Sequence, residues 1–220
     1  KRDLFYYSNQ GAMPSFKSAA VILKVTDYAE FDRIVSFYTR DHGRLRGIAK
    51  GAKRSQKRFG GALEPFTHNE VDCFEREGHG LARLENCRII NTFPAISQDI
   101  KKIAYGHYLL ELVNTLTPER EKHPEIFDLL LFFLNLLSSK PPREDILRIF
   151  EMRLTSLLGY QPQLLQCVSC GRKYVPEVAY RFSVNKGGIL CSGCHKESTA
   201  YPCLSHGTIK IFQQAQQLSL

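Results

Sequence analysis

Short runs in which apolar and polar residues alternate fill the chain from Ser18 to about Thr92. Turn-forming residues separate the runs, a pattern typical of β-strands joined by short connections. Five strands of this length suit a small β-barrel. The runs are SAAVILKVTDY, DRIVSFYTRDHG, RLRGIAKGA, PFTHNEVDCFERE and GLARLENCRII.

The third run predicts a strand with two chemically different faces, because successive side chains of a strand point to opposite sides. Glycines within it also permit the bends that a narrow barrel requires. The small or apolar face comprises Leu45, Gly47, Ala49 and Gly51. The cationic face comprises Arg44, Arg46 and Lys50.

After Pro94 the residues that face one side recur every three or four positions, which predicts helices over residues 97–116, 124–138 and 142–158. The segment FDLLLFFLNLL is apolar on nearly all sides, so we expect its helix to be buried; the alternative is a groove for a partner peptide. A closing helix is expected over SHGTIKIFQQAQQL, with Ser205 as its N-cap. The first helix places Ile103, His107, Leu110 and Asn114 at helical spacing.

The formal net charge of +8 is concentrated in one segment. Between Arg40 and Arg58 the chain has eight basic residues and one acidic residue. Such a local excess favours a polyanionic partner, and the alternative is a solvated loop. We expect DNA contacts from Arg40, Arg44, Arg46, Lys50, Lys53, Arg54, Lys57 and Arg58.

The last four of these cations are expected to form a mobile cationic arm beyond the third strand. Aromatic side chains beside such an arm can stack on bases. Phe59 is a candidate for stacking, whereas Phe66 begins a predicted strand and is expected to pack in the interior.

Motifs of nucleotide-driven enzymes are missing from the sequence. The segment GIAKGAKRS departs from a phosphate-binding P-loop in its glycine spacing and in the residues around Lys53, and no G-x-G-x-x-G occurs. Asp27, Glu30 and Asp32 are close in sequence but are expected to be solvated residues beside turns. A metal-dependent nuclease or DNA-modifying enzyme, and a zinc-ribbon transcription factor, stay open as alternatives to a non-enzymatic DNA-binding protein.

Two C-x-x-C pairs, CVSC and CSGC, are separated by twenty residues. This spacing predicts one zinc ion held by Cys167, Cys170, Cys191 and Cys194. Four thiolates leave no position for a reacting water, so the zinc should be structural. Disulfides or free thiols are the alternatives, and His195 or Cys203 could replace one ligand. Cys73 and Cys87 are expected to be small buried groups.

No apolar run is long enough for a membrane span, so we expect a soluble protein with no membrane partner. The paired cysteines without a secretion signal favour a reducing compartment. Residues 1–12, which precede Met13, are interpreted as a tag remnant.

The order of these parts resembles the RecO family of bacterial recombination mediators. The residues that carry the resemblance are AAVILKVTDYAEFDRIVSFYTRDHGRLRGIAKGAKR, FGGALEPF and the two cysteine pairs. The resemblance implies an α+β multidomain protein, with a five-stranded OB-fold barrel at 13–92 and a central helical bundle within 93–220. A four-cysteine zinc knuckle or ribbon would be embedded at about 164–203.

The same resemblance implies a function without enzymatic turnover. RecO-like proteins bind single- and double-stranded DNA, anneal complementary strands, associate with RecR and with the single-strand binding protein, and thereby help to load RecA. Some of them lack the cysteines, which agrees with a structural metal. The implied location is the bacterial cytoplasm, in association with the nucleoid.

Overall fold

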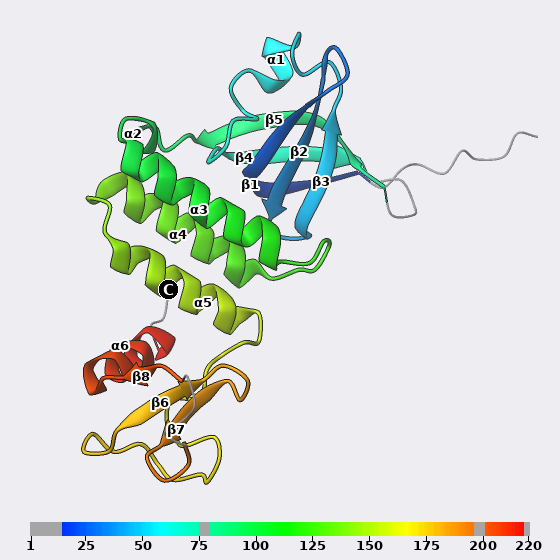
Figure 1. Cartoon of the computed structure of the whole chain (residues 1–220). Helices are drawn as coiled ribbons and strands as arrows, with labels where there is room; N and C mark the ends of the chain where they lie inside the picture. Colours follow the sequence, from blue (N-terminus) through cyan, green and yellow to red (C-terminus); the bar gives the residue numbers. More distant parts are fainter. Residues whose placement is uncertain (1–14, 75–79, 196–200, 218–220) are drawn as a thin grey trace, which may run out of the picture.

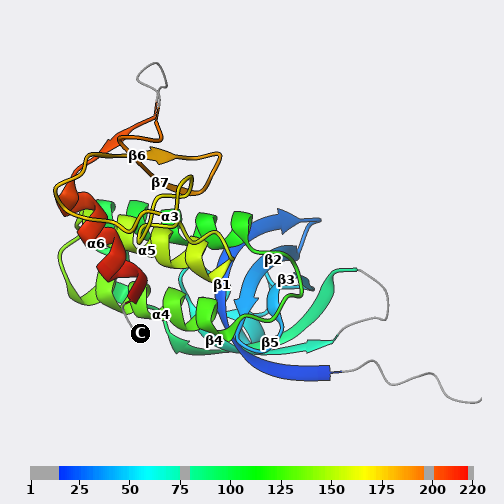
Figure 2. The same ribbon diagram turned by 90° about the horizontal axis from the view of Figure 1, so that it is seen from below.

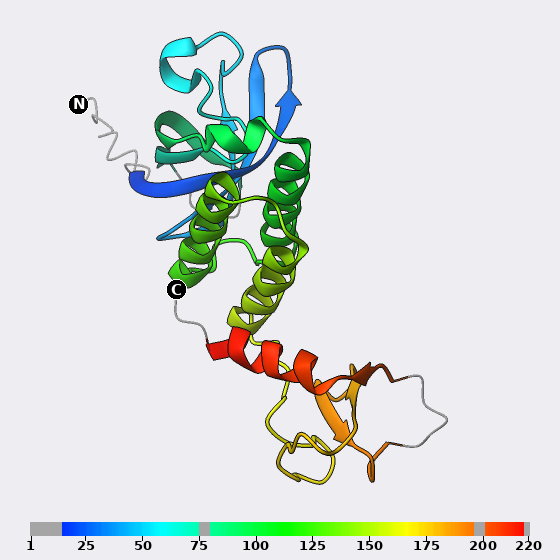
Figure 3. The ribbon, with the colours of Figure 1, turned by 90° about the vertical axis from the view of Figure 1, so that its left-hand side faces the viewer.

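The computed structural model describes residues 15–74, 80–195 and 201–217, so the predicted tag remnant lies outside the described residues. Three parts follow one another through the molecule (Figure 1). A β-barrel lies at one end and a group of helices lies in the middle. A small sheet and the last helix lie at the far end, which Figure 3 shows most clearly.

The barrel has five strands and is closed in the order β1-β2-β3-β5-β4. Neighbouring strands are antiparallel except β3 and β5, which pair in parallel through Gly47 and Ala82 and through Ile48 and Arg83. This arrangement confirms the OB-fold. The strands are β1 (Ser15–Tyr28), β2 (Asp32–Thr39), β3 (Gly43–Ala49), β4 (His68–Phe74) and β5 (Ala82–Asn91).

The predicted alternation along β3 is confirmed. Leu45, Gly47 and Ala49 are buried, whereas Arg46 is exposed. A side chain at position 47 would have its Cβ 3.1 Å from the ring of Phe37 and from the carbonyl oxygen of Ala82, so the narrow barrel leaves little room there.

The segment between β3 and β4 closes one end of the barrel. It contains the one-turn helix α1 (Gln56–Phe59), and Phe59, Ala62 and Leu63 enter the barrel core. Phe59 is 4% exposed, so this candidate ring is not available to stack on bases.

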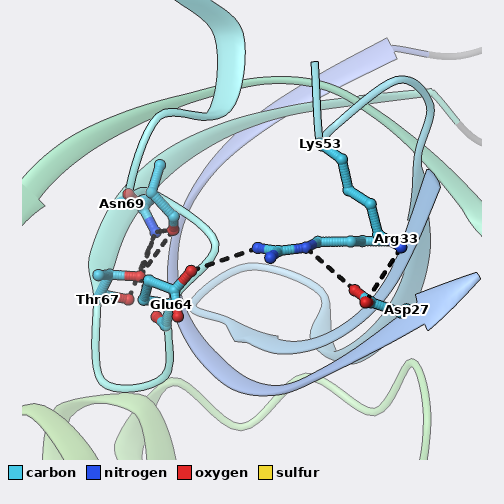
Figure 4. Close-up of polar contacts among 7 residues, drawn as sticks. Asp27, Arg33, Lys53, Glu64, Thr67 and Asn69 are labelled. Atoms are coloured by element: carbon cyan, nitrogen blue, oxygen red, sulfur yellow. Dashed lines mark hydrogen bonds and ion pairs between the residues drawn. The ribbon is translucent and has the colours of Figure 1, made fainter. Parts of the chain in front are cut away.

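Polar bonds fix this segment to the start of β4. The hydroxyl of Thr67 and the amide of Asn69 both donate to the carbonyl oxygen of Ala62, at 2.7 and 2.8 Å (Figure 4).

Four helices follow the barrel: α2 (Pro94–Ser97), α3 (Ile100–Leu116), α4 (Pro124–Ser139) and α5 (Glu144–Leu157). The expected helix over 97–116 is interrupted, because the carboxylate of Asp99 accepts the backbone N–H groups of Lys101 and Lys102 and begins α3 there. The helix α4 is buried as predicted, through Ile126, Phe127, Leu129, Leu130, Phe133, Leu134 and Leu137.

The barrel and the helices share one hydrophobic core. Val21, Leu23 and Tyr38 point out of the barrel and pack among side chains of α2, α3, α4 and α5. Figure 2 shows α3 and α4 beside the strands that they contact. Phe66 packs against this core as expected, partly buried and with its ring 4.7 Å from that of His107, but it precedes β4 and does not begin it.

The cysteine-rich segment forms a separate core with the last helix. Its strands β6 (Tyr180–Ser183), β7 (Gly188–Cys191) and β8 (Cys203–Leu204) pair in the order β7-β6-β8. The helix α6 (His206–Gln217) is capped as predicted, because Ser205 Oγ accepts the backbone N–H of Thr208 at 3.0 Å. Within the part of the chain described, no helix combines the length and apolarity needed to cross a bilayer.

Candidate nucleic-acid interface and metal site

The outer surface of β1, β2 and β3 carries two rows of side chains. One row runs across the strands through Lys24, Ser36 and Arg46, which are register partners. The next row comprises Thr26, Ile34 and Ile48. A hollow of about 350 Å³ lies over this surface, bounded on the other side by the end of α3.

The predicted cations do not form one continuous patch. Arg40 lies in the turn between β2 and β3, where its guanidinium pairs with Asp128 of α4 at 3.0 Å. Lys50 and the residues after it lie at the opposite end of these strands, because β2 and β3 are antiparallel.

Arg44 is drawn toward the helices. Its Nε donates to the carbonyl oxygen of Thr117 at 2.9 Å, and its Nη1 lies 3.2 Å from the carboxylate of Glu119. The backbone N–H of Arg120 donates to the carbonyl oxygen of Arg44, so the segment after α3 adds to the edge of β3. Arg44 was expected to line the cationic face, but its side chain is only 16% exposed and holds the barrel to the helices.

The expected mobile arm is a folded loop with internal contacts. Lys53 pairs with Asp27 at 3.1 Å, and Asp27 also pairs with Arg33, which reaches Glu64 on its other side (Figure 4). The ammonium of Lys53 is the main cause that holds the pKa of Asp27 below its ordinary value.

Two further cations stabilise this loop. The guanidinium of Arg54 lies 3.0 Å from the centre of the Phe31 ring, a cation–π contact. Arg58 donates to the carbonyl oxygen of Lys50 at 2.7 Å.

Among the described residues, four exposed cations of this region have no side-chain partner: Lys24, Arg46, Lys50 and Lys57. Lys24 was not among the predicted contacts. Its position in the first alternating run was a usable signal, but only the strand register shows that it lies beside Arg46. Tyr28 ends β1 on the same surface with 51% of its side chain exposed.

Two of the three acidic residues near the turns, Asp27 and Asp32, have structural partners, whereas Glu30 is exposed and has none among the described residues. Asp27 forms the ion pairs described above, and the carboxylate of Asp32 accepts the backbone N–H of Gly51 at 2.8 Å. Among the described residues the one group of His, Cys, Asp and Glu side chains arranged to hold a metal ion is a set of four cysteines.

That group comprises the predicted ligands Cys167, Cys170, Cys191 and Cys194, whose Sγ atoms all lie within 4.8 Å of one another. The sulfurs of Cys170 and Cys191 are 3.7 Å apart. Two sulfurs bound to one tetrahedral zinc at ordinary bond lengths are separated by about 3.8 Å. The residues therefore fit a four-coordinate thiolate site.

The electrostatics of the four thiols also fit a bound cation. Burial of the Cys167 thiol raises its pKa, but the backbone N–H groups of Cys191, Cys170 and Ser169 outweigh this and lower the pKa to about 6. Hydrogen bonds with the neighbouring sulfurs raise the pKa of the Cys194 thiol to about 12. Without a cation, four sulfurs this close cannot all be thiolates at neutral pH.

The other cysteines lie outside this group. Cys73 and Cys87 are buried in the barrel, as expected, and burial raises the pKa of Cys87 to about 12. Cys203 is exposed, and neither it nor His195 belongs to the four-residue cluster.

Comparison with known proteins identifies the family of this chain. Residues 13–93 match the family model described as "Recombination protein O N terminal", and residues 97–220 match "Recombination protein O C terminal". The chain belongs to the RecO family. It is 40% identical over 202 residues to "DNA repair protein RecO" of Geobacter sulfurreducens, covering 92% of this chain and 81% of the relative.

Other RecO relatives show similar coverage. The chain is 37% identical over 205 residues to "DNA repair protein RecO" of Anaeromyxobacter dehalogenans, covering 93% of this chain and 80% of the relative. For the protein of the same name from Syntrophus aciditrophicus the identity is 38% over 204 residues. RecO proteins are DNA repair mediators and not a class of enzymes, as the resemblance implied.

Proposed function

We propose that this RecO protein binds single- and double-stranded DNA along the outer surface of β1, β2 and β3 and the adjoining loop. The observation that carries the proposal is the set of unpaired cations on an OB-fold barrel, namely Lys24, Arg46, Lys50 and Lys57. OB-folds bind nucleic acids on this kind of surface, where cations follow the phosphates and aromatic rings stack on bases. Tyr28 is the exposed ring in a suitable place.

The bound DNA is then annealed to its complement without covalent chemistry. Two complementary strands repel each other through their phosphates, and lysine and arginine side chains reduce that repulsion when they displace condensed counterions. Base pairing supplies the driving force. The proposed contacts to phosphates carry no sequence information, so annealing should proceed with any complementary pair.

The four-cysteine cluster is proposed to hold one zinc ion. When bound, zinc would join the two C-x-x-C segments and complete the small core around β6 and β7. Cys167, Cys170, Cys191 and Cys194 would be its ligands.

The helical part of residues 93–220 is proposed to bind partner proteins. A hollow of about 590 Å³ between α4 and α5 is lined by the half-exposed ring of Phe132, by Leu157 and by the cation Arg153. Glu125 and Asp128 also line the hollow, and Asp128 pairs with Arg40. An acidic, partly apolar tail of the single-strand binding protein would therefore place a carboxylate at Arg153 and its apolar side chains at Phe132 and Leu157. RecR association and RecA loading follow the family, and this role calls for a position at the chromosome in the bacterial cytoplasm.

The test measures binding and annealing with two charge-matched variants. Lys24→Ala/Arg46→Ala/Lys50→Ala removes three cations from the proposed surface, whereas Lys173→Ala/Lys186→Ala/Lys210→Ala removes three exposed lysines around the cysteine-rich segment and α6. The first variant should lose at least about tenfold in affinity for a labelled single strand, and its salt slope should fall by about 2 units. The second variant should stay within about twofold of the wild type.

Annealing of labelled complementary strands, with and without magnesium, separates the other functions. Faster duplex formation with intact strands supports the proposal. Shortened strands would instead indicate a nuclease, and strong preference for one duplex sequence would indicate a transcription factor. Equal DNA affinity of the wild type and both variants would show that DNA does not bind on this surface of the barrel.

A further inference from the structure

Cationic, apolar, amide and carboxylate side chains all line the hollow over β1, β2 and β3. Lys24 and Arg46 supply positive charge, and the partly exposed Ile34 supplies an apolar surface. Asn114 of α3 closes the hollow on the helical side, and Glu119 stands at its edge. The hollow is thus built jointly by the barrel and by the helical part of the chain.

Asn114 is held in place by the barrel and keeps its donors available. The hydroxyl of Ser36, whose residue is only 8% exposed, donates to Asn114 Oδ1 at 2.6 Å. The Nδ2 atom of Asn114 has no hydrogen-bond partner among the described residues. Its two N–H groups are therefore free for a ligand that presents an acceptor.

We propose that this hollow binds one nucleotide of single-stranded DNA, with its phosphate at Lys24 and Arg46 and its base at Ile34 and Asn114. This inference rests on the proposed DNA-binding function and assigns it a subsite. The volume of the hollow is at the lower end of small-ligand sites, about 300 Å³, which suits one nucleotide. An unpaired base can turn out of its strand into the hollow, whereas a base held in a duplex cannot do so without the cost of unpairing and unstacking.

The donor set also explains why the subsite would accept any sequence. Asn114 Oδ1 uses one of its two lone pairs to accept from Ser36, whereas both N–H groups of the amide are free donors. Every base has at least one acceptor on its edge, and each base also has an apolar face that can lie on Ile34. The subsite therefore distinguishes single strands from duplexes without selecting a sequence.

Glu119 is the opposing charge at this subsite. Its carboxylate lies 3.2 Å from Arg44, and its side chain is 45% exposed at the edge of the hollow. A phosphate at Arg46 and this carboxylate repel each other, so Glu119 weakens the binding of the strand. Neutralising Glu119 should strengthen binding, and placing a carboxylate at position 114 should weaken it.

The test uses Asn114→Asp and Glu119→Gln in the full chain. Asn114→Asp keeps an acceptor for Ser36 but removes both N–H donors and adds a negative charge, so the affinity for a short labelled single strand should fall about tenfold. Glu119→Gln keeps the shape and should raise that affinity about threefold. Affinity for duplex DNA should change less than affinity for the single strand in both variants, because a paired base does not enter the hollow.

Thr115→Asp is the matched control, because it adds the same charge to the same helix at an exposed position outside the lining of the hollow. It should leave the ratio of single-strand to duplex affinity within about twofold of the wild type. A wild type that binds no DNA would refute the proposed function itself. A wild type that binds DNA, with the ratio unchanged in both Asn114→Asp and Glu119→Gln, would refute the nucleotide subsite alone.

Discussion

Gly43 begins β3 where the barrel meets the segment that follows α3. Its φ of +66° belongs to the left-handed region, which costs other residues free energy. A Cβ at this position would lie 1.9 Å from the carbonyl oxygen of Glu121, which is backbone and cannot rotate away. The close approach of the two parts therefore depends on glycine at this residue.

The variant Gly43→Ala should lose about 3 kcal/mol in the free energy of unfolding, from backbone strain together with displacement of residues 119–121. Gly61→Ala is the matched control, because its φ is +71° and no atom lies within 4 Å of a Cβ built there. That control should lose only about 1 kcal/mol. Chemical denaturation measures both values, and equal losses would contradict the role assigned to the contact at Glu121.

Cys170 and Cys203 are both exposed, but only Cys170 belongs to the sulfur cluster. Metal analysis of freshly purified protein should give about one zinc per chain, and Cys170→Ser should reduce this to near zero because a closed four-thiolate site loses a ligand. In the Cys170→Ser variant, residues 164–203 should become sensitive to protease. Cys203→Ser should keep the metal, and a wild type without zinc would refute the assignment.

At the scale of secondary-structure elements, the cations of the loop from Lys50 to Arg58 fall into two groups with different roles. Lys53, Arg54 and Arg58 contact Asp27, Phe31 and the carbonyl oxygen of Lys50. Lys50 and Lys57 have exposed side chains without a partner among the described residues. The first three cations hold the shape of the loop, and the other two are available to phosphates.

The double variant Lys50→Ala/Lys57→Ala should flatten the dependence of log affinity on log salt by up to about 1.4 units for single strands, since each phosphate contact contributes about 0.7. Backbone hydrogen exchange in the loop should stay as in the wild type. Arg54→Ala/Arg58→Ala should instead speed exchange across the loop, because it removes bonds that fix the backbone. An unchanged salt slope in the first variant would mean that Lys50 and Lys57 do not contact phosphates and that the loop is an ordinary solvated surface.

The elements themselves were largely predictable from local pattern. Alternation located the five strands, helical spacing located α4 and α5, and the C-x-x-C spacing located all four clustered thiols. The break at Asp99 was missed because an N-cap competes with a helical pattern only through its own side-chain bonds. Arg44 and Lys24 were misjudged or missed because their surroundings come from strand register and from α3, which are distant in sequence.

At the scale of the whole molecule, the protein has two regions, each with its own hydrophobic cluster. The barrel and the helices α2 to α5 share a hydrophobic cluster through Val21, Leu23 and Tyr38. Deleting the barrel, residues 1–92, would therefore expose the apolar side chains of this cluster. Point variants are for that reason better tests of the proposed protein-binding surface on the helices. The cysteine-rich segment has its own cluster, which includes Tyr180 and Ile209.

This division predicts what removal of the metal does. The side chains of Gln213 and Gln216 on α6 donate to the carbonyl oxygens of Leu164 and Pro162, so α6 is attached to the cysteine-rich segment. Its bonds to the bundle are longer, with Arg153 of α5 lying 3.5 Å from the carbonyl oxygen of Ala215. A chelator should therefore loosen residues 164–195 and α6 and leave the barrel and α3 folded.

Hydrogen exchange measured by mass spectrometry tests this prediction peptide by peptide. After chelation, exchange should rise at least about tenfold in peptides from residues 164–195 and in those of α6, because a metal-dependent core has lost its folding energy. Peptides from β1 to β5 and from α3 should exchange as before, since their shared core contains no metal ligand. The variant Cys170→Ser, treated in the same way, should show no further change, which separates zinc removal from other effects of the chelator. Faster exchange throughout the barrel would mean that the two regions unfold as one unit, and that the zinc site stabilises the DNA-binding surface directly.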